Sequence, residues 1–260
     1  MGEQRLIGVT QHFRVSIDTD LGDLPALIVL DNCENDFAVI QEYFGSIQPL
    51  LLPIEVYIVD QEGASWNPRL GPKAMTCGTK GRDQMELPWF PSFLTAVELV
   101  EFFAVAQVGG INGLGWNPGR SAGEGLSRVI GDSLYGGASV HTPVVIQWFG
   151  DGSSANQPDF VNNNSTDLDD VAVGCAVLFL NYLRFVLNIA WNSIVTLGGT
   201  ANVNFKLILR DVYSFNTDVD EDPFPQFQSY VNSIPFFPSR LQFGDNPFWH
   251  ATGDPSDLGY

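Results

Sequence analysis

Three glutamates stand at spacings that suit carboxylate chemistry: Glu98 and Glu101 within residues 97–101, and Glu124 another 23 residues along the chain. Residues three apart lie on one face of a helix, so Glu98 and Glu101 would project together from a helix here. Neighbouring carboxyl groups acquire different pKa values and can serve as a general acid and a general base. Alternatively, they can hold a hard cation such as Ca²⁺ or Mg²⁺. Arg128, four residues after Glu124, is the expected charge partner of these glutamates.

Residues 97–101 also have the spacing of the zinc-peptidase motif H-E-x-x-H, with Glu98 at the position of the general base. Val97 and Glu101 stand where the two histidines would bind zinc. The histidines of the chain are scattered singly, at His12, His141 and His250. Because zinc affinity rests on nitrogen and sulfur ligands, we expect no zinc at this site.

Several stretches over most of the chain resemble a family of zincin-like proteins in which A-E-x-x-E replaces H-E-x-x-H and is followed by G-E-G-L-S-R. These stretches lie at residues 12–15, 32–36, 43–45, 98–103, 123–128, 174–181 and 245–248. G-E-G-L-S-R is similar in turn to the N-E-x-x-S-D motif of thermolysin-type peptidases, whose Glu binds zinc, but Arg128 replaces the final Asp. Family members often carry a Cys where this chain has Asn117. The resemblance implies a zincin-like fold with a degenerate metal centre.

Alternating, β-branched segments are concentrated in the first third of the chain, and long apolar patterns of helical period follow. We expect strands at 5–17 and 53–59, a helix at 34–45, and a loop over 60–90 with a short strand near 74–77. Further helices are expected at 93–108, 124–135, 171–188, 191–197, 202–211 and 225–233. This order predicts an α+β fold in a single domain, 1–260, with two lobes, 1–90 and 91–260, as the alternative. The resemblance implies that this α+β fold is zincin-like.

The composition indicates a folded and strongly acidic protein. The net charge is −18 and the isoelectric point is near 4.2. Such a charge repels nucleic acid and anionic membranes, so neither is an expected partner. No apolar leader follows Met1, which predicts a cytoplasmic protein, or a secreted one if the natural chain was trimmed. The odd number of cysteines, Cys33, Cys77 and Cys175, allows either one disulfide or three free thiols.

Three functions remain open from these patterns. The first is a non-catalytic, metallopeptidase-like scaffold without a cofactor, which binds an unknown protein or a second copy of itself. The second is a hydrolase that uses the three glutamates, with or without a hard cation such as Ca²⁺ or Mg²⁺; Asn112 and Trp116 in the glycine-rich segment 109–123 would then line a lid. The third is a self-assembling structural protein whose Pro/Phe-rich tail, from residue 235, is an interaction strip.

The acidic segment 218–222 lacks the Gly and distal Glu of an EF-hand, so we expect a solvated turn there.

Overall fold

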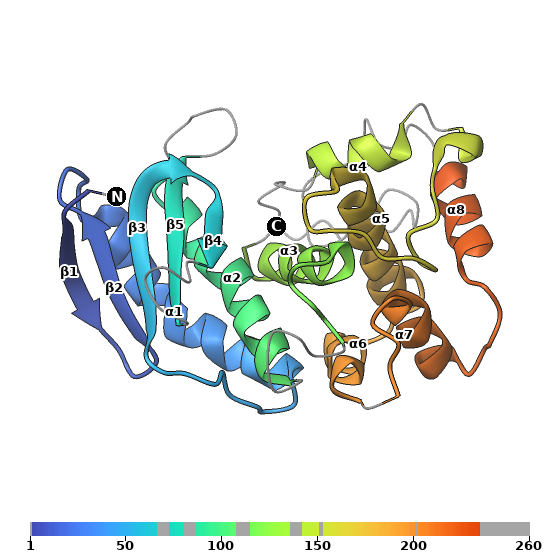
Figure 1. The fold of residues 1–260 in the computed structure, drawn as a ribbon, viewed down its shortest axis with the longest axis horizontal. Helices are drawn as coiled ribbons and strands as arrows, with labels where there is room; N and C mark the ends of the chain where they lie inside the picture. The colour runs from blue at the N-terminus through green and yellow to red at the C-terminus, as the bar shows by residue number, and fades with distance from the viewer. Residues whose placement is uncertain are drawn as a thin grey trace, which may run out of the picture.

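The structure is a computed structural model that describes residues 2–66, 73–80, 87–107, 115–135, 142–150, 153–200 and 202–234. Its first part is a mixed sheet with the strand order β1-β2-β3-β5-β4 (Figure 1). The strands are β1 (Gln4–Val9), β2 (Phe13–Asp18), β3 (Ile54–Glu62), β4 (Ala64–Trp66) and β5 (Ala74–Lys80). Strands β2, β3 and β5 run parallel, while β1 and β4 are antiparallel edge strands. Alternate residues of β2 and β3 are fully buried, so one face of the sheet forms part of the core.

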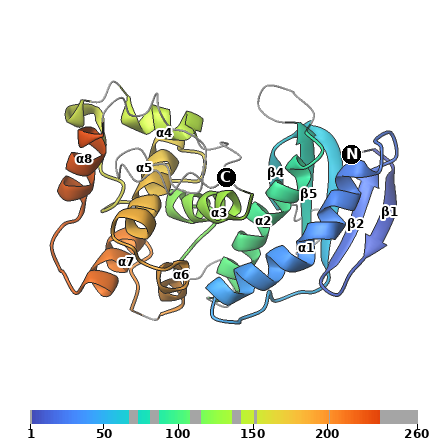
Figure 2. The same cartoon turned by 180° about the vertical axis from the view of Figure 1, so that it is seen from behind.

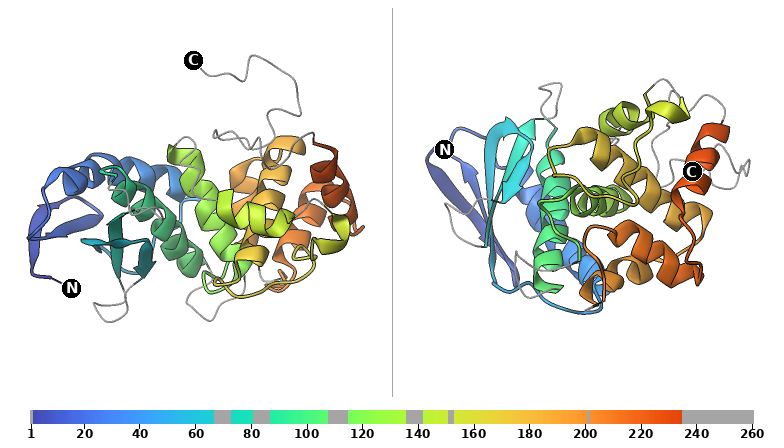
Figure 3. Two further views of the ribbon diagram at one scale, coloured as in Figure 1. Left: turned by 90° about the horizontal axis from the view of Figure 1, so that it is seen from above. Right: turned by 45° about the vertical axis from the view of Figure 1, so that its right-hand side comes forward.

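The other regular elements of the described chain are helices. They are α1 (Leu24–Tyr43), α2 (Phe90–Gln107), α3 (Ser121–Tyr135), α4 (Thr142–Phe149), α5 (Asp170–Asn181), α6 (Trp191–Thr196), α7 (Ile208–Thr217) and α8 (Phe224–Ser233), with short turns η1 (Ser154–Asn156), η2 (Tyr182–Val186) and η3 (Leu197–Gly199). Helices α1 and α2 pack against the sheet, and Figure 2 shows them on the same face of it. Helix α3 lies between α2 and α5, so α2 and α3 stand between the sheet and α5 (Figure 3). The predicted α+β fold, with a β-rich front half and a helical back half, is confirmed.

Several expected boundaries were wrong for identifiable physical reasons. The single strand expected at 5–17 is a hairpin, because Thr10 folds the chain back and its hydroxyl accepts a hydrogen bond from the Phe13 amide. The helix expected at 34–45 begins ten residues earlier, with a proline in its first turn, where proline is well tolerated. The region 60–90 contains two strands rather than one. The helix expected at 202–211 begins only at Ile208, because the Asn204 amide donates to the Asp211 carboxylate in a turn ahead of it.

Helix α2 is buried over most of its length. Every residue from Phe90 to Val100 is buried, and the segment includes the charged Glu98. Within the described chain, α2 is the one helix long and apolar enough to cross a membrane by length and composition, and 72% of that span is buried inside the protein.

A buried polar network ties α2 to its two neighbours. The Tyr135 hydroxyl, at the end of α3, donates a 2.6 Å hydrogen bond to the Asp36 carboxylate of α1. The Ser92 hydroxyl of α2 lies 2.6 Å from the same tyrosine oxygen. Burial raises the pKa of Asp36 to about 6, and burial also raises the pKa of Tyr135. Ser92 lies within α2 and joins this network through its hydroxyl.

The buried Asp36 should make stability depend on pH. A carboxyl group whose pKa is about 6 when folded and near 4 when unfolded binds a proton more tightly in the folded state. Asp36 therefore makes its full contribution to the free energy of unfolding below pH 4. This contribution, on the order of 2 kcal/mol, is lost as the pH rises through 6. We expect Asp36→Asn to reduce the fall in the free energy of unfolding between pH 4.5 and pH 7, measured by urea denaturation. The control is Asp31→Asn, an exposed residue of the same helix. Equal pH dependence in all three proteins would contradict the assignment.

Candidate carboxyl site between helices α2 and α3

The three glutamates singled out by spacing lie together at the contact between α2 and α3. Helix α2 supplies Glu98 and Glu101, and α3 supplies Glu124. The Glu101 and Glu124 carboxyl groups are hydrogen-bonded to each other, and Glu98 acts on Glu101 electrostatically. The predicted convergence of these residues is thus seen in the structure.

Glu101 is the residue whose protonation is most strongly affected. Burial raises its pKa well above the ordinary value, and the negative charges of Glu98 and Glu124 raise it further. Asp167, in the loop before α5, contributes a smaller effect of the same sign. Burial and the neighbouring negative charges therefore both favour the protonated form of Glu101, which can donate a hydrogen bond. The hydrogen bond with Glu124 favours the same protonated form of Glu101.

Arg128 compensates the charge of Glu124, as the sequence predicted. Its Nε atom lies 2.8 Å from Glu124 Oε1, one turn along the same helix. The two side chains are 20% and 19% exposed, whereas Glu98 is only 7% exposed. The group therefore extends from the core, at Glu98, to the surface, at Arg128, and water reaches its outer end.

The glycines of the G-E-G-L-S-R segment allow close packing around Glu124. A Cβ on Gly123 would lie 2.1 Å from the Asn117 carbonyl oxygen, and one on Gly125 would lie 2.7 Å from Ala176 Cβ of α5. Ser127 is fully buried, and its hydroxyl donates to the Glu124 carbonyl oxygen. The small residues of this motif thus position α3 against its surroundings, and Glu124 and Arg128 are its chemically active members.

Two residues near the start of α3 have structural roles in place of those expected. Trp116 is fully buried, and its indole N–H donates to the Val195 carbonyl oxygen, so it does not line a lid. Asn112, the other expected lid residue, lies outside the described residues. Asn117, where the family often has a Cys, accepts a hydrogen bond from Gly119 N through its side chain.

Asn164 and Asp167, in the loop before α5, were not identified as members of the site from the sequence. The Asn164 side chain accepts hydrogen bonds from the Ser121 hydroxyl and the Ala122 amide, and donates one to the Phe205 carbonyl oxygen. It fixes the first turn of α3, and so the position of Glu124, while Asp167 adds charge beside Glu101. The sequence carried no signal that this loop returns to α3.

The side chains present here do not fit a zinc ion. All the candidate ligands are carboxyl groups; the pKa of one, Glu101, is raised, and another, Glu124, is paired with Arg128. Across the described parts of the chain, no group of three or more His, Cys, Asp and Glu side chains is arranged to hold a metal ion. The expected Ca²⁺ or Mg²⁺ site at Glu98, Glu101 and Glu124 gains no support from this arrangement and stays a prediction.

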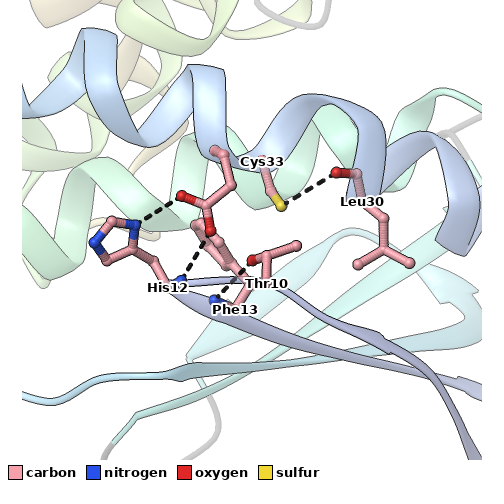
Figure 4. A network of polar contacts seen from close by, with 6 residues as sticks. Thr10, His12, Phe13, Leu30 and Cys33 are labelled. Carbon is pink, nitrogen blue, oxygen red and sulfur yellow. Dashed lines mark hydrogen bonds and ion pairs between the residues drawn. The ribbon is translucent and has the colours of Figure 1, made fainter.

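The histidine and cysteine side chains that the structure describes have other surroundings. The His12 and Phe37 rings are stacked with their centroids 3.9 Å apart, and His12 Nδ1 lies 2.7 Å from Glu34 Oε2. Figure 4 shows His12 in the same network of polar contacts as Thr10 and Cys33. His141 and His250 lie outside the described residues. Cys33, Cys77 and Cys175 are all buried free thiols, which decides between the two cysteine alternatives. Burial raises the pKa of all three, to about 12 for Cys33, so none is a nucleophile at neutral pH.

Comparison with known proteins gives only a distant structural likeness. No protein-family model and no curated protein sequence matches the chain. Among solved structures, the chain is similar to yeast LTA4 hydrolase in complex with bestatin, with 10% sequence identity and a TM-score of 0.47. The match covers 90% of this chain but only 38% of that one, so this chain spans well under half the length of its structural neighbour.

Because the backbone approaches closely at Gly123, we expect substitutions at Gly123 and at nearby Gly119 to have different effects on stability. Gly123→Ala should lower the free energy of unfolding by about 1–3 kcal/mol, because the added methyl group collides with a backbone oxygen. Gly119→Ala should be neutral or slightly stabilising, since its Cβ would make an ordinary 3.4 Å contact with the Asn117 side chain. Chemical denaturation of the two variants measures this difference. Equal effects would show that α3 does not depend on the close approach at Gly123.

Proposed function

We propose that this chain is a metallopeptidase-like scaffold of the zincin type, with a proton-sharing carboxyl group in place of the zinc centre, and that it acts in binding or structure. The hydrogen bond between Glu101 and Glu124, with Arg128 paired to Glu124, is the observation that carries the proposal. A cation could enter only if Glu101 released its proton and Glu124 gave up its ion pair. Because these internal interactions already compensate the buried charge, the site has no electrostatic need for a metal.

Elemental analysis tests the absence of a metal centre directly. We expect less than 0.1 equivalent of zinc, calcium, magnesium or manganese after dialysis, and no cleavage of a mixed peptide library, as rough thresholds for an unoccupied site. A Glu98→Gln/Glu101→Gln double variant provides the comparison. A stoichiometric metal in the parent protein that disappears in this variant would contradict the proposal.

Matched amide variants test the proton assignment through stability. Glu101→Gln keeps a hydrogen-bond donor toward Glu124 and should leave the free energy of unfolding at pH 7 nearly unchanged. Glu124→Gln leaves Arg128 without its carboxylate and should cost about 1 kcal/mol, since both side chains are partly exposed. Because the pKa of Glu101 is raised, the parent protein should lose stability as the pH rises through it, and Glu101→Gln should abolish that loss. Equal destabilisation by both variants at pH 7 would indicate two ionised glutamates.

A hydrolase that uses the same carboxyl groups is the second candidate, and the raised pKa of Glu101 favours it. A protonated carboxyl group beside ionised ones, at a position reached by water, is an arrangement found in acid–base catalysts. Glu101 would then act as the general acid and Glu98 as the general base, with or without a hard cation. A screen of glycoside, ester and peptide substrates distinguishes this candidate, since an activity abolished by both Glu98→Gln and Glu101→Gln would replace the first proposal.

Self-assembly stays a prediction that this site does not address. The Pro/Phe-rich tail on which it was based lies outside the described residues. The partners, compartment and cofactor expected from the sequence likewise stay predictions.

A further inference from the structure

A hollow of about 530 Å³ lies between the residues that follow α6 and helix α7. Its volume falls within the range of roughly 300–1,000 Å³ that is usual for small-molecule sites. It is lined by Leu197, Thr200, Asn202, Val203, Asp211, Ser214, Phe215, Asp218, Val219 and Asp220. None of these residues belongs to the carboxyl site, so the two features can be tested separately.

The apolar part of this hollow has a floor and a wall. Leu197 and Val203 are 6% and 5% exposed and belong to the core. Phe215, in contrast, leaves 71% of its surface exposed. An aromatic or aliphatic group in the hollow would cover this ring and rest on the two buried side chains.

The charged part of the lining has a single sign. Three of its members are aspartates, and the described residues that line the hollow include no Lys, Arg or His. Arg210, on the same helix, has its Nη2 atom 3.8 Å from Asp220 Oδ1, which is too long for a hydrogen bond, and the Asp220 side chain is fully exposed. Asp211 accepts a hydrogen bond from Asn204 N, and burial raises its pKa, so this carboxylate is partly shielded from water. An incoming cation would compensate these charges.

We propose that this hollow binds a small organic cation, an ammonium group carried on an aromatic body. The ammonium group would lie among Asp211, Asp218 and Asp220, while the aromatic body would rest on Leu197 and Val203. Phe215 would contribute its ring face, to which cations are attracted. A neutral or anionic analogue of the same shape lacks the charge that this lining complements. The acidic segment 218–222, expected to be no more than a solvated turn, would then supply part of a ligand site.

Tryptamine is a suitable probe, with N-acetyltryptamine and indole-3-acetate as neutral and anionic analogues. Titration of the ¹⁵N-labelled protein, followed by amide chemical shifts, measures both affinity and location. We expect saturable shifts in residues 200–220 with tryptamine, and binding at least about tenfold weaker for either analogue, since one lost charge interaction of about 1.4 kcal/mol gives this factor. Equal binding of tryptamine and its N-acetyl analogue, or shifts confined to other parts of the chain, would overturn the proposal.

Two variants that should not disturb folding locate the contacts. Phe215→Ala removes an exposed ring, and Asp218→Asn keeps a residue that tolerates the left-handed conformation found there, with φ of 57°. Each should weaken tryptamine binding about fivefold or more, as expected for the loss of one cation contact. The control Asp20→Asn changes the net charge equally at an exposed position near the sheet and should leave binding unchanged. Unchanged binding in both test variants would overturn the assignment. Binding of a Lys-Trp-Lys tripeptide at least tenfold more tightly than tryptamine would also overturn the assignment, because it would indicate a peptide site.

Discussion

The central constraint on this fold is that helix α2 runs through the interior and still carries two carboxyl groups. An ionised carboxylate in such surroundings costs several kcal/mol unless it is paired or protonated. The chain meets this constraint from α3, which brings Glu124 to Glu101 and Arg128 to Glu124. The position of α3, and therefore the packing of the helical half on the sheet, is tied to this charge arrangement.

Close packing and charge compensation depend on each other around α3. Gly123 and Gly125 allow the loop before α3 and helix α5 to approach the backbone, and Asn164 fixes the first turn of the helix. At the other end, Tyr135 connects α3 to α1 through Asp36. Displacing α3 by even a small distance would separate Glu124 from Glu101 and leave buried charge without compensation. A carboxyl site on two rigid helices, anchored at both ends of one of them, is therefore well defined in position.

The sequence was sufficient to predict those parts of the molecule whose structure follows from a local pattern of residues. The apolar pattern of α2 and the four-residue spacing of Glu124 and Arg128 predicted the helices, their charge pair and the meeting of the glutamates. Loops that return from a distance could not be predicted in this way, because Asp167 and Asn164 reach α3 through tertiary contacts. Hydrogen bonds in turns also changed two boundaries that the apolar pattern had predicted. The bond at Thr10 divides the expected first strand, and the bond at Asn204 precedes the later start of α7.

The central claim is that Glu101 holds a proton at neutral pH and shares it with Glu124. The most direct measurement is ¹³C NMR of protein labelled at the glutamate side-chain carboxyl carbon, recorded from pH 3 to pH 9. The account predicts one glutamate resonance that stays at the protonated position at pH 7 and is missing from the spectrum of Glu101→Gln. If every glutamate resonance instead titrates near its ordinary value of about 4.3, no proton is held between α2 and α3, and the account of the site is wrong.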